Sequence, residues 1–224
     1  MRVFGGQLAG LELLSPGERV RPSMERLRDA CARFFEGRLA GSRVVDLFAG
    51  TGALGLELLS NGAASCDFIE NGTSAMHSLK ANTASARARL KKIALAAARE
   101  EVRLLAVEAS KPRSRANAPT AAPATDAPAP VKPFKDPIRV FFKDAIPFVE
   151  ALSPYAYDIA VCDPPYGSKK LERVLATWHA KPFARWLALE HAPLHVIDTM
   201  HRLVHRSRVE DSVLSILEQP PAQT

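Results

Sequence analysis

The pattern of hydrophobic and polar positions changes at about residue 43, where short apolar runs begin to alternate with segments of helical period. This alternation is typical of a parallel sheet covered by helices on both faces, because such strands are buried on both sides. The predicted strands are Arg43–Phe48, Ser65–Glu70, Ile138–Lys143, Tyr157–Cys162 and Arg185–Glu190. The predicted helices are Ala53–Ser60, Ser74 to about Leu105, Ala145–Leu152 and Lys169–Trp178. The pattern therefore predicts an α/β fold.

The beginning of the chain has a different pattern. Two short apolar runs surround Gly5 and Gly6, which favours a small hairpin or arm. A helix is then predicted from Pro22, with Ser23 able to cap it, and its apolar positions recur at helical spacing until Gly37. We expect residues 1–40 to form an N-terminal arm and helix.

The end of the chain alternates in the segment Met200–Leu217, which predicts an antiparallel pair that closes the sheet. The main domain is therefore expected to span residues 41–218, followed by a short tail of residues 219–224. One segment interrupts it, because seven of the seventeen prolines lie in the alanine-rich stretch Pro112–Pro137. Proline disfavours both helix and central strand, so we predict a flexible insertion at about 106–136.

Charge makes a polyanionic partner plausible. The formal net charge is +6, and Ser85–Arg115 carries nine lysines and arginines against three glutamates. Two interpretations of this basic helix stay open, an arm that contacts RNA and a solvated extension. No apolar run is long enough for a membrane span and the N-terminus lacks an unbroken apolar core, so we expect a cytoplasmic protein without membrane association.

Cysteine and histidine spacing does not favour metal binding. Cys31, Cys66 and Cys162 are far apart in apolar stretches, so buried free thiols are expected in place of disulfides or zinc ligands. His191 and His195, like His201 and His205, have pairwise spacing without a cysteine or carboxylate cluster to complete a site. We predict no metal, and surface or strand-end positions for the histidines.

The first motif with chemical meaning joins the strand that ends near Phe48 to the next helix through a glycine-rich turn, Gly50-Thr51-Gly52. Backbone approaches a nucleotide-like ligand closely at such a turn. Glu70, at the end of the next strand, is placed to accept hydrogen bonds from ribose hydroxyls. These two features also fit a nicotinamide dinucleotide. Asp46 favours S-adenosylmethionine, because a carboxylate there suits an ammonium better than a pyrophosphate.

The second motif is Asp163-Pro164-Pro165-Tyr166, directly after a predicted apolar strand. Ligands of open parallel sheets bind beyond the carboxyl ends of the strands, so this peptide is expected to face the same crevice as the glycine-rich turn. The Asp163 carboxylate and the Pro164 carbonyl offer two acceptors to an exocyclic amine, and Tyr166 offers a stacking face to the base. Cys162 is expected to be a packed thiol and no nucleophile.

Seven stretches, in this order and spacing, resemble the family of bacterial 16S rRNA guanine-N2 methyltransferases of the RsmD type. They are Arg2-Val3-Phe4-Gly5-Gly6, Arg21-Pro22-Ser23, DLFAGTGALGLE at 46–57, Asn61-Gly62-Ala63, Phe68-Ile69-Glu70, Asp144-Ala145 and Asp163–Tyr166. The resemblance implies a Rossmann-like class I methyltransferase fold, a seven-stranded, mostly parallel sheet with an antiparallel last strand and helices on both faces. This sequence departs from the family at Ser23, where threonine is usual, and at Asp211, where glycine is usual.

The resemblance also implies roles for individual residues. The S-adenosyl-L-methionine site would comprise Asp46, Phe48, Ala49, Gly50, Thr51, Gly52, Gly55, Glu70, Asn71, Asp144 and Ala145. Asp46 and the glycines would hold the methionine part, Glu70 the ribose and Asp144 the adenine amine. The catalytic residues would be Asp163, Pro164, Pro165 and Tyr166. The RNA contacts would be Arg2, Gly5, Gly6, Arg21, Pro22 and Ser23.

The leading hypothesis is therefore methylation of guanine N2 in ribosomal RNA on an assembling small ribosomal subunit, by a monomer. The Asp-Pro-Pro-Tyr motif also serves adenine and cytosine amines, so a DNA amino-methyltransferase is the first alternative. A nicotinamide-dependent oxidoreductase would use the glycine-rich turn and leave that motif unexplained. A non-catalytic RNA-binding protein that keeps the fold is the fourth hypothesis.

Overall fold

The computed structural model describes residues 1–15, 22–109, 134–165, 168–197 and 202–220. Its strands are β1 (Arg43–Leu47), β2 (Ser65–Glu70), β3 (Ile138–Phe142), β4 (Tyr157–Cys162), β5 (Ala184–His191), β6 (Leu203–Val209) and β7 (Ser212–Glu218). Its helices are the 3-10 helix η1 (Gly6–Leu8) and the α-helices α1 (Pro22–Phe34), α2 (Ala53–Ser60), α3 (Thr73–Ala109), α4 (Ala145–Glu150) and α5 (Lys170–Ala180). Each predicted strand and helix is therefore present, with bounds that differ by a few residues.

The seven strands form one sheet in the order β3-β2-β1-β4-β5-β7-β6. The first five strands are parallel, and β7 is antiparallel to both of its neighbours. The predicted class I methyltransferase fold is confirmed, as is the antiparallel pair at the end of the chain.

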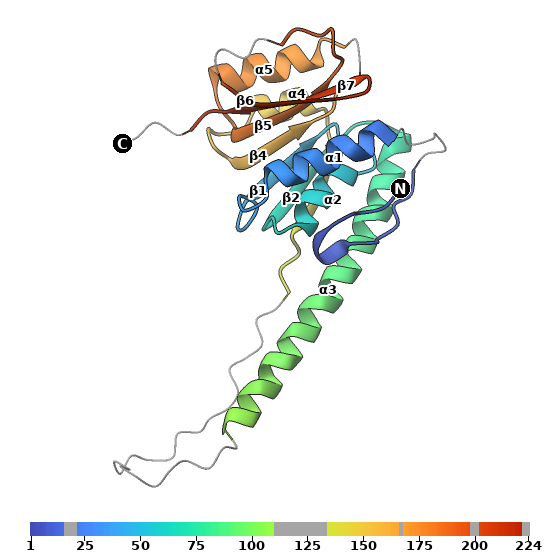
Figure 1. The fold of residues 1–224 in the computed structure, drawn as a ribbon, viewed down its shortest axis with the longest axis vertical. Helices are drawn as coiled ribbons and strands as arrows, with labels where there is room; N and C mark the ends of the chain where they lie inside the picture. The colour runs from blue at the N-terminus through green and yellow to red at the C-terminus, as the bar shows by residue number, and fades with distance from the viewer. Residues whose placement is uncertain (16–21, 110–133, 166–167, 198–201, 221–224) are drawn as a thin grey trace.

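Helices cover both faces of this sheet, with α1, α2 and α3 on one face and α4 and α5 on the other (Figure 1). Successive residues of a strand point to opposite faces, so β1 contributes to two cores. Val44 belongs to the core under α1–α3, whereas Val45 and Leu47 belong to the core under α4 and α5. Continuous apolar strands of this kind produced the pattern seen in the sequence.

The three cysteines are buried and free, as predicted. Cys162 is 1% exposed, and burial raises the pKa of its thiol well above the usual value. A thiol in this state is a packing group and a poor nucleophile. The expectation of a packed thiol at Cys162 is confirmed.

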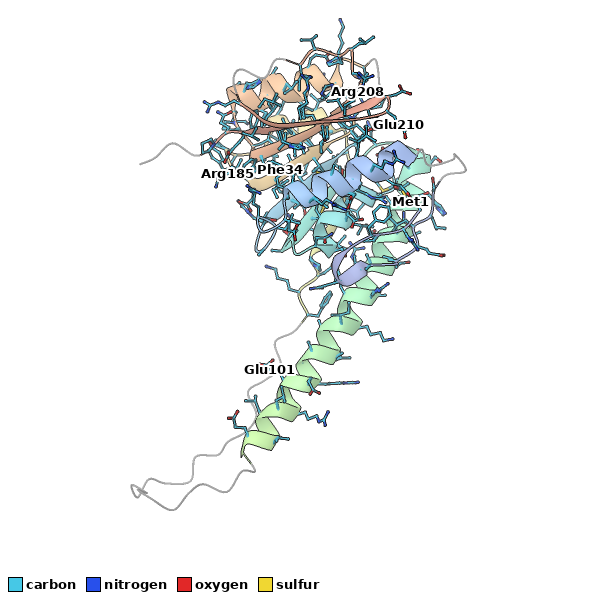
Figure 2. All side chains as sticks on the ribbon, viewed as in Figure 1. Met1, Phe34, Glu101, Arg185, Arg208 and Glu210 are labelled. Atoms are coloured by element: carbon cyan, nitrogen blue, oxygen red, sulfur yellow. The ribbon has the colours of Figure 1, made fainter. Side chains whose placement is uncertain are left out.

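Helix α3 is longer than predicted and leaves the body of the protein. It continues to Ala109, a few residues beyond the predicted end at about Leu105, because strong helix formers persist there and the first proline comes only at Pro112. Its far half, around Glu101, extends well away from the sheet (Figure 2). The rest of the predicted insertion up to residue 133 lies outside the described residues. No helix in the described part of the chain is both long and apolar enough to cross a membrane.

The first residues form an arm that packs on the main core. Arg2 pairs antiparallel with Glu12, and η1 lies between them. The arm buries Val3, Leu8 and Leu13, which belong to the same core as the side chains of α2 and α3. The arm is therefore continuous with the main domain in its packing.

Candidate active site at the carboxyl edge of the sheet

The predicted site segments emerge at one edge of the sheet. Strands β1 and β4 are parallel neighbours, and Leu47 lies opposite Cys162 in their register. The glycine-rich turn follows Leu47 directly, and Asp163-Pro164-Pro165 follows Cys162 directly. The structure therefore brings together the two motifs that the sequence analysis assigned to one crevice, while Tyr166 lies outside the described residues.

The glycine-rich turn has a backbone that few residues other than glycine adopt. Gly50 and Gly52 have φ angles of 56° and 78°, and Phe48 has a φ of 61°. A Cβ on Gly52 would lie 2.6 Å from Leu79 Cδ1, so α3 packs directly against this turn. Left-handed conformation and close approach together explain the two glycines. The left-handed conformation of Phe48 strains the backbone, because its side chain is bulky. Such strained residues cluster at functional sites, and this turn is predicted to bind a ligand.

Glu70 shapes the turn from the end of β2. Its Oε2 accepts a hydrogen bond from Gly50 N at 2.8 Å, and its Oε1 accepts from Asn71 N at 2.9 Å and Gly72 N at 2.6 Å. The carboxylate is thus oriented by three backbone donors at the position predicted to meet a ribose. A charged acceptor fixed in this way is preorganised for hydroxyl ligands.

Asp144 occupies the corresponding position after β3. Its Oδ1 caps α4 by accepting from Ile146 N at 2.9 Å, and its Oδ2 accepts from Asn71 Nδ2 at 3.0 Å. Lys170 Nζ lies 3.7 Å from the same Oδ2 and 5.2 Å from the centre of the Phe48 ring. Ala145, the first residue of α4, is buried. The ends of β1, β2 and β3 and the start of α5 therefore converge.

Asp46 points into the interior from β1 and is only 3% exposed. Its Oδ2 accepts a hydrogen bond from Gly55 N, in the first turn of α2, at 2.9 Å. The pKa of this carboxyl is raised to about 7, mainly by burial; the Gly55 hydrogen bond opposes the rise, and the charge of Glu70 adds to it. Gly55 has no room for a side chain, because a Cβ there would lie 2.5 Å from the Phe68 ring. Asp46 therefore fastens the start of α2 beneath the turn.

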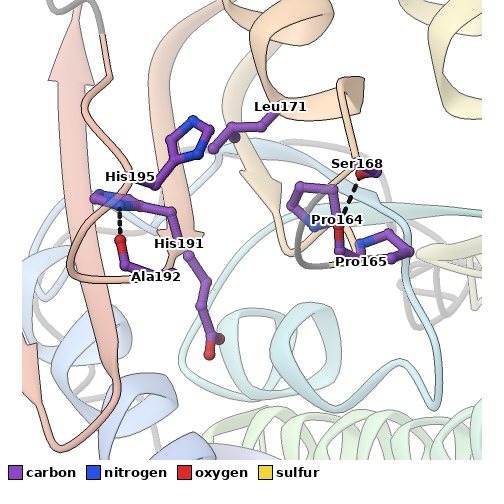
Figure 3. Close-up of a pocket in the computed structure, with 8 residues that line it drawn as sticks. Pro164, Pro165, Ser168, Leu171, His191, Ala192 and His195 are labelled. Atoms are coloured by element: carbon purple, nitrogen blue, oxygen red, sulfur yellow. Dashed lines mark hydrogen bonds between the residues drawn. The ribbon is translucent and has the colours of Figure 1, made fainter.

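A small cavity of about 30 Å³ lies beside the Pro164-Pro165 peptide, at the ends of β4 and β5 (Figure 3). The Pro165 carbonyl accepts a hydrogen bond from Ser168 Oγ at 2.7 Å. Leu171, His191 at the end of β5 and His195 also line the cavity. A space of this size holds a water molecule and no more than a small part of a base.

Both ring nitrogens of His191, one of the two histidines that line this cavity, lie within hydrogen-bonding distance of a partner atom. His191 is 1% exposed at the end of β5, and its Nε2 and Nδ1 lie 2.9 Å from Ser215 Oγ and the Ala192 carbonyl oxygen, respectively. Burial lowers the pKa of His191. The predicted strand-end position is confirmed for this residue, which is buried. Within the described ranges, no three His, Cys, Asp or Glu side chains are grouped to hold a metal ion.

The predicted RNA contacts lie in two places. Gly5 and Gly6 pack on the C-terminal end of α2, at the opposite edge of the sheet from the glycine-rich turn: Gly5 N donates to Glu57 Oε1 at 2.9 Å. Arg2 is exposed, and its carbonyl accepts from the buried Arg28 at 2.9 Å. The start of α1 lies at the carboxyl edge, because Arg26 pairs with Glu210 in the β6–β7 turn.

Pro22 and Ser23 begin α1 at that edge, whereas Arg21 lies outside the described residues.

Two residues at the site were missed by sequence reasoning. Lys170 gave no signal beyond its place in the helix after the second motif. Asn82 did give one, since it is a polar residue on the buried face of a helix.

Comparison with known proteins agrees with this arrangement. The family described as "Conserved hypothetical protein 95" matches residues 1–114. Among curated proteins, the chain is 36% identical over 91 residues to "Ribosomal RNA small subunit methyltransferase D" of Escherichia coli K12, and 34% identical over 83 residues to "Putative rRNA methyltransferase YlbH" of Bacillus subtilis. These matches span 39% and 37% of this chain and 45% of each relative, less than half of their length.

Among solved structures, the fold is similar to that of "Putative methyltransferase yhhF from Escherichia coli", with a TM-score of 0.65 and 20% identity. That superposition covers 98% of this chain and 97% of the other. The shared fold thus extends over the whole length, well beyond the segments that match in sequence.

Proposed function

Because the chain belongs to the family described as "Conserved hypothetical protein 95", the S-adenosylmethionine-dependent methyltransferases of the RsmD type, we propose that it methylates the exocyclic N2 amine of a guanine in small-subunit (16S) ribosomal RNA. The substrate is the part of this statement that goes beyond family membership. The name of the Escherichia coli relative supports a small-subunit RNA, and the net charge of +6 favours a polyanion.

One observation carries the proposal: Leu47 and Cys162 are register partners on adjacent parallel strands. The glycine-rich turn and the Asp163-Pro164-Pro165 peptide therefore leave the sheet side by side. Methyl transfer needs the electrophilic carbon and the amine in contact, and these two segments are the ones proposed to hold them.

The residues at this edge suit the cofactor. Glu70 presents a carboxylate for the ribose hydroxyls, and Asp144 with Asn71 presents acceptor and donor groups for the adenine edge. Asp46, beneath the turn, is proposed to favour the ammonium of the methionine part. When bound, the cofactor supplies a methyl group on a sulfonium centre.

The second motif is proposed to orient the nucleophile. Asp163 and the Pro164 carbonyl accept the two N–H bonds of the amine, which directs the nitrogen lone pair at the methyl carbon. The amine loses one proton when it is methylated, and Asp163 is the proposed acceptor of that proton. Tyr166 is proposed to stack on the flipped base. Catalysis then rests on positioning and electrostatics.

The test is transfer of labelled methyl groups to small-subunit particles from a strain lacking the enzyme, to naked 16S RNA and to duplex DNA. Label at guanine N2 of ribosomal RNA, located by mass spectrometry, is the expected result. Incorporation into DNA alone would establish the DNA amino-methyltransferase alternative, and incorporation into none of the three would refute the proposal.

Asp163→Asn should lower kcat by about 10²–10³-fold, a typical cost of losing an oriented polar group at a reacting centre, while the Kd for S-adenosylhomocysteine stays the same. Asp158→Asn is the matched control: Asp158 lies at the other end of β4 and pairs with Arg43 at 3.1 Å. That variant should keep wild-type kcat. Equal kcat in the Asp163 variant and the wild type would remove Asp163 from the mechanism.

A further inference from the structure

The buried face of α3 contains polar side chains, among them Asn82, that its apolar spacing does not explain. Leu79, Ala86 and Leu90 recur at helical intervals and are at most 7% exposed. Asn82 lies on the same face and is 2% exposed. A buried amide is costly unless its polar atoms are hydrogen-bonded, so the partners of Asn82 reveal what it does.

Those partners belong to two different segments. Asn82 Oδ1 accepts from Leu14 N at 2.7 Å, and its Nδ2 donates to the Leu14 carbonyl at 3.0 Å and to the Thr51 carbonyl at 2.9 Å. The amide pairs with Leu14 as a neighbouring strand would, and its remaining N–H reaches the glycine-rich turn. Both donors and the acceptor oxygen of the side chain are used.

The two joined segments face different ligands in the proposed reaction. Thr51 lies between Gly50 and Gly52, in the turn assigned to the cofactor. Leu14 ends the N-terminal arm, and a few residues further along the chain α1 begins at the same edge, where RNA contact is predicted. A single side chain thus connects the cofactor turn to the entry of the RNA-docking segment.

We propose that Asn82 is a positioning residue that couples cofactor binding at the glycine-rich turn to docking of the N-terminal arm, and through it to RNA binding. The RNA part rests on the proposed function; the coupling of turn and arm does not. A ligand that holds the Thr51 carbonyl toward Asn82 also favours the amide orientation that holds Leu14. Such coupling is reciprocal, so docking of the arm should favour the cofactor by the same factor.

A matched control exists on the same helix. Arg89 Nη2 donates to the Ala9 carbonyl at 2.8 Å, so Arg89 also fastens the arm to α3, two helical turns away from Asn82 and from the glycine-rich turn. Arg89→Met should loosen the arm without breaking its connection to the cofactor turn. Asn82→Ala removes the connection, and Asn82→Asp keeps the acceptor but loses both donated hydrogen bonds.

The first measurement is hydrogen exchange of the amides of Leu11, Leu13 and Leu14 with and without S-adenosylhomocysteine. In the wild type and in Arg89→Met, the ligand should slow their exchange. In both Asn82 variants the ligand should still bind, and exchange of these amides should no longer respond to it. A ligand response in the Asn82 variants equal to the wild type, or none in the wild type, would overturn the proposal. Failure of both Asn82 variants to fold would show a purely structural role and would also overturn it.

The second measurement is the Kd for S-adenosylhomocysteine with and without 16S RNA. We expect RNA to tighten binding about 5-fold or more in the wild type and in Arg89→Met, in the usual range of coupling between sites, and to leave it unchanged in Asn82→Ala. The same ratio in Asn82→Ala as in the wild type would refute coupling to RNA. If the wild type binds S-adenosylhomocysteine but no RNA, the proposed substrate fails, and the exchange measurement still decides the role of Asn82.

Discussion

At the scale of single residues, Asp46 shows how one carboxylate serves the fold and the proposed site together. It is buried under the glycine-rich turn and held by Gly55 N. Because burial raises its pKa to about 7, the Asp46 carboxyl is partly protonated near neutral pH. Its charge therefore depends on the charged groups placed next to it. An ammonium placed near Asp46 would favour the ionised form.

This raised pKa gives a prediction for stability. An unfolded aspartate has a pKa of about 3.9, so between about pH 4 and 7 the folded state holds a proton that the unfolded state has released. The stability contributed by this group is complete below pH 4 and is lost as the pH rises through 7. In urea unfolding, the free energy of unfolding should therefore decline less between pH 5 and 8 in Asp46→Asn than in the wild type. An identical decline would show that Asp46 ionises normally.

The same pKa makes cofactor binding proton-linked. If the ammonium of S-adenosylhomocysteine meets Asp46, its binding at pH 6 should release protons, because the neighbouring positive charge lowers the pKa of this carboxyl. Calorimetric titration in two buffers of different ionisation enthalpy measures this release, and Asp46→Asn should abolish most of it. Equal release by both proteins would place the ammonium elsewhere.

At the scale of the elements, the N-terminal arm owes its position to backbone contacts with α2. Phe4 N and Gly5 N donate to the Glu57 carboxylate, Leu8 N donates to Ser60 Oγ at 2.8 Å, and Ser60 Oγ donates to the Gly5 carbonyl. Such close approach explains a glycine pair that sequence analysis could assign only to a bend or to substrate. The arm is therefore built as part of the fold, whatever it contacts in RNA.

Gly6 gives the corresponding prediction. It has a φ of +69°, and a Cβ there would lie 1.9 Å from the Ser60 carbonyl oxygen. Gly6→Ala should lower the free energy of unfolding by more than the 1–3 kcal/mol that is roughly the cost of left-handed backbone alone, because the arm must also move. Gly10→Ala is the control, since Gly10 has a similar φ of +79° but open space around it. Equal losses in denaturant melts of the two variants would mean that the contact with α2 is unimportant.

At the scale of the whole molecule, the projecting half of α3 is separable from the body. Leu90 is the last buried side chain that the structure describes along α3. Arg87 Nε and Asp136 Oδ2 are 2.8 Å apart, so the chain leaves the body and returns to it at nearly the same place. Loop closure at this point needs only a short connection.

We therefore predict that replacing residues 92–134 with a Gly/Ser linker of about six residues leaves a cooperatively folded protein with unchanged affinity for S-adenosylhomocysteine. Thermal melts and calorimetric titration check this. Leu79→Ala, in the buried half of α3, is the contrasting control and should cost about 2–5 kcal/mol of stability. Loss of cooperative unfolding in the shortened chain would show that the projection supports the core. Its methylation rate on ribosomal particles decides between an RNA-contacting arm and a solvated extension.

The residue pattern was enough to predict the α/β fold, the antiparallel pair at the end of the chain and the placing of both motifs at strand ends, and the resemblance to a known family implied the class I fold. Buried parallel strands leave continuous apolar runs, and a tight turn at a strand end leaves glycines, so both features are local in the sequence. The end of α3 was less well predicted, because residues with high helix propensity continue beyond the part of the helix that packs on the core. The roles of individual site residues stay predictions.

Only the tertiary structure decided which distant groups meet. Nothing near Asn82 in the sequence indicates that its amide joins Leu14 to Thr51, and the position after the second motif does not reveal that Lys170 faces Asp144. The difference is physical: strand and turn signals arise from neighbouring residues, whereas these contacts depend on how α3, α5 and the arm pack around the sheet. Burial, which raises the pKa of Asp46 to about 7, is likewise a property of the packed molecule.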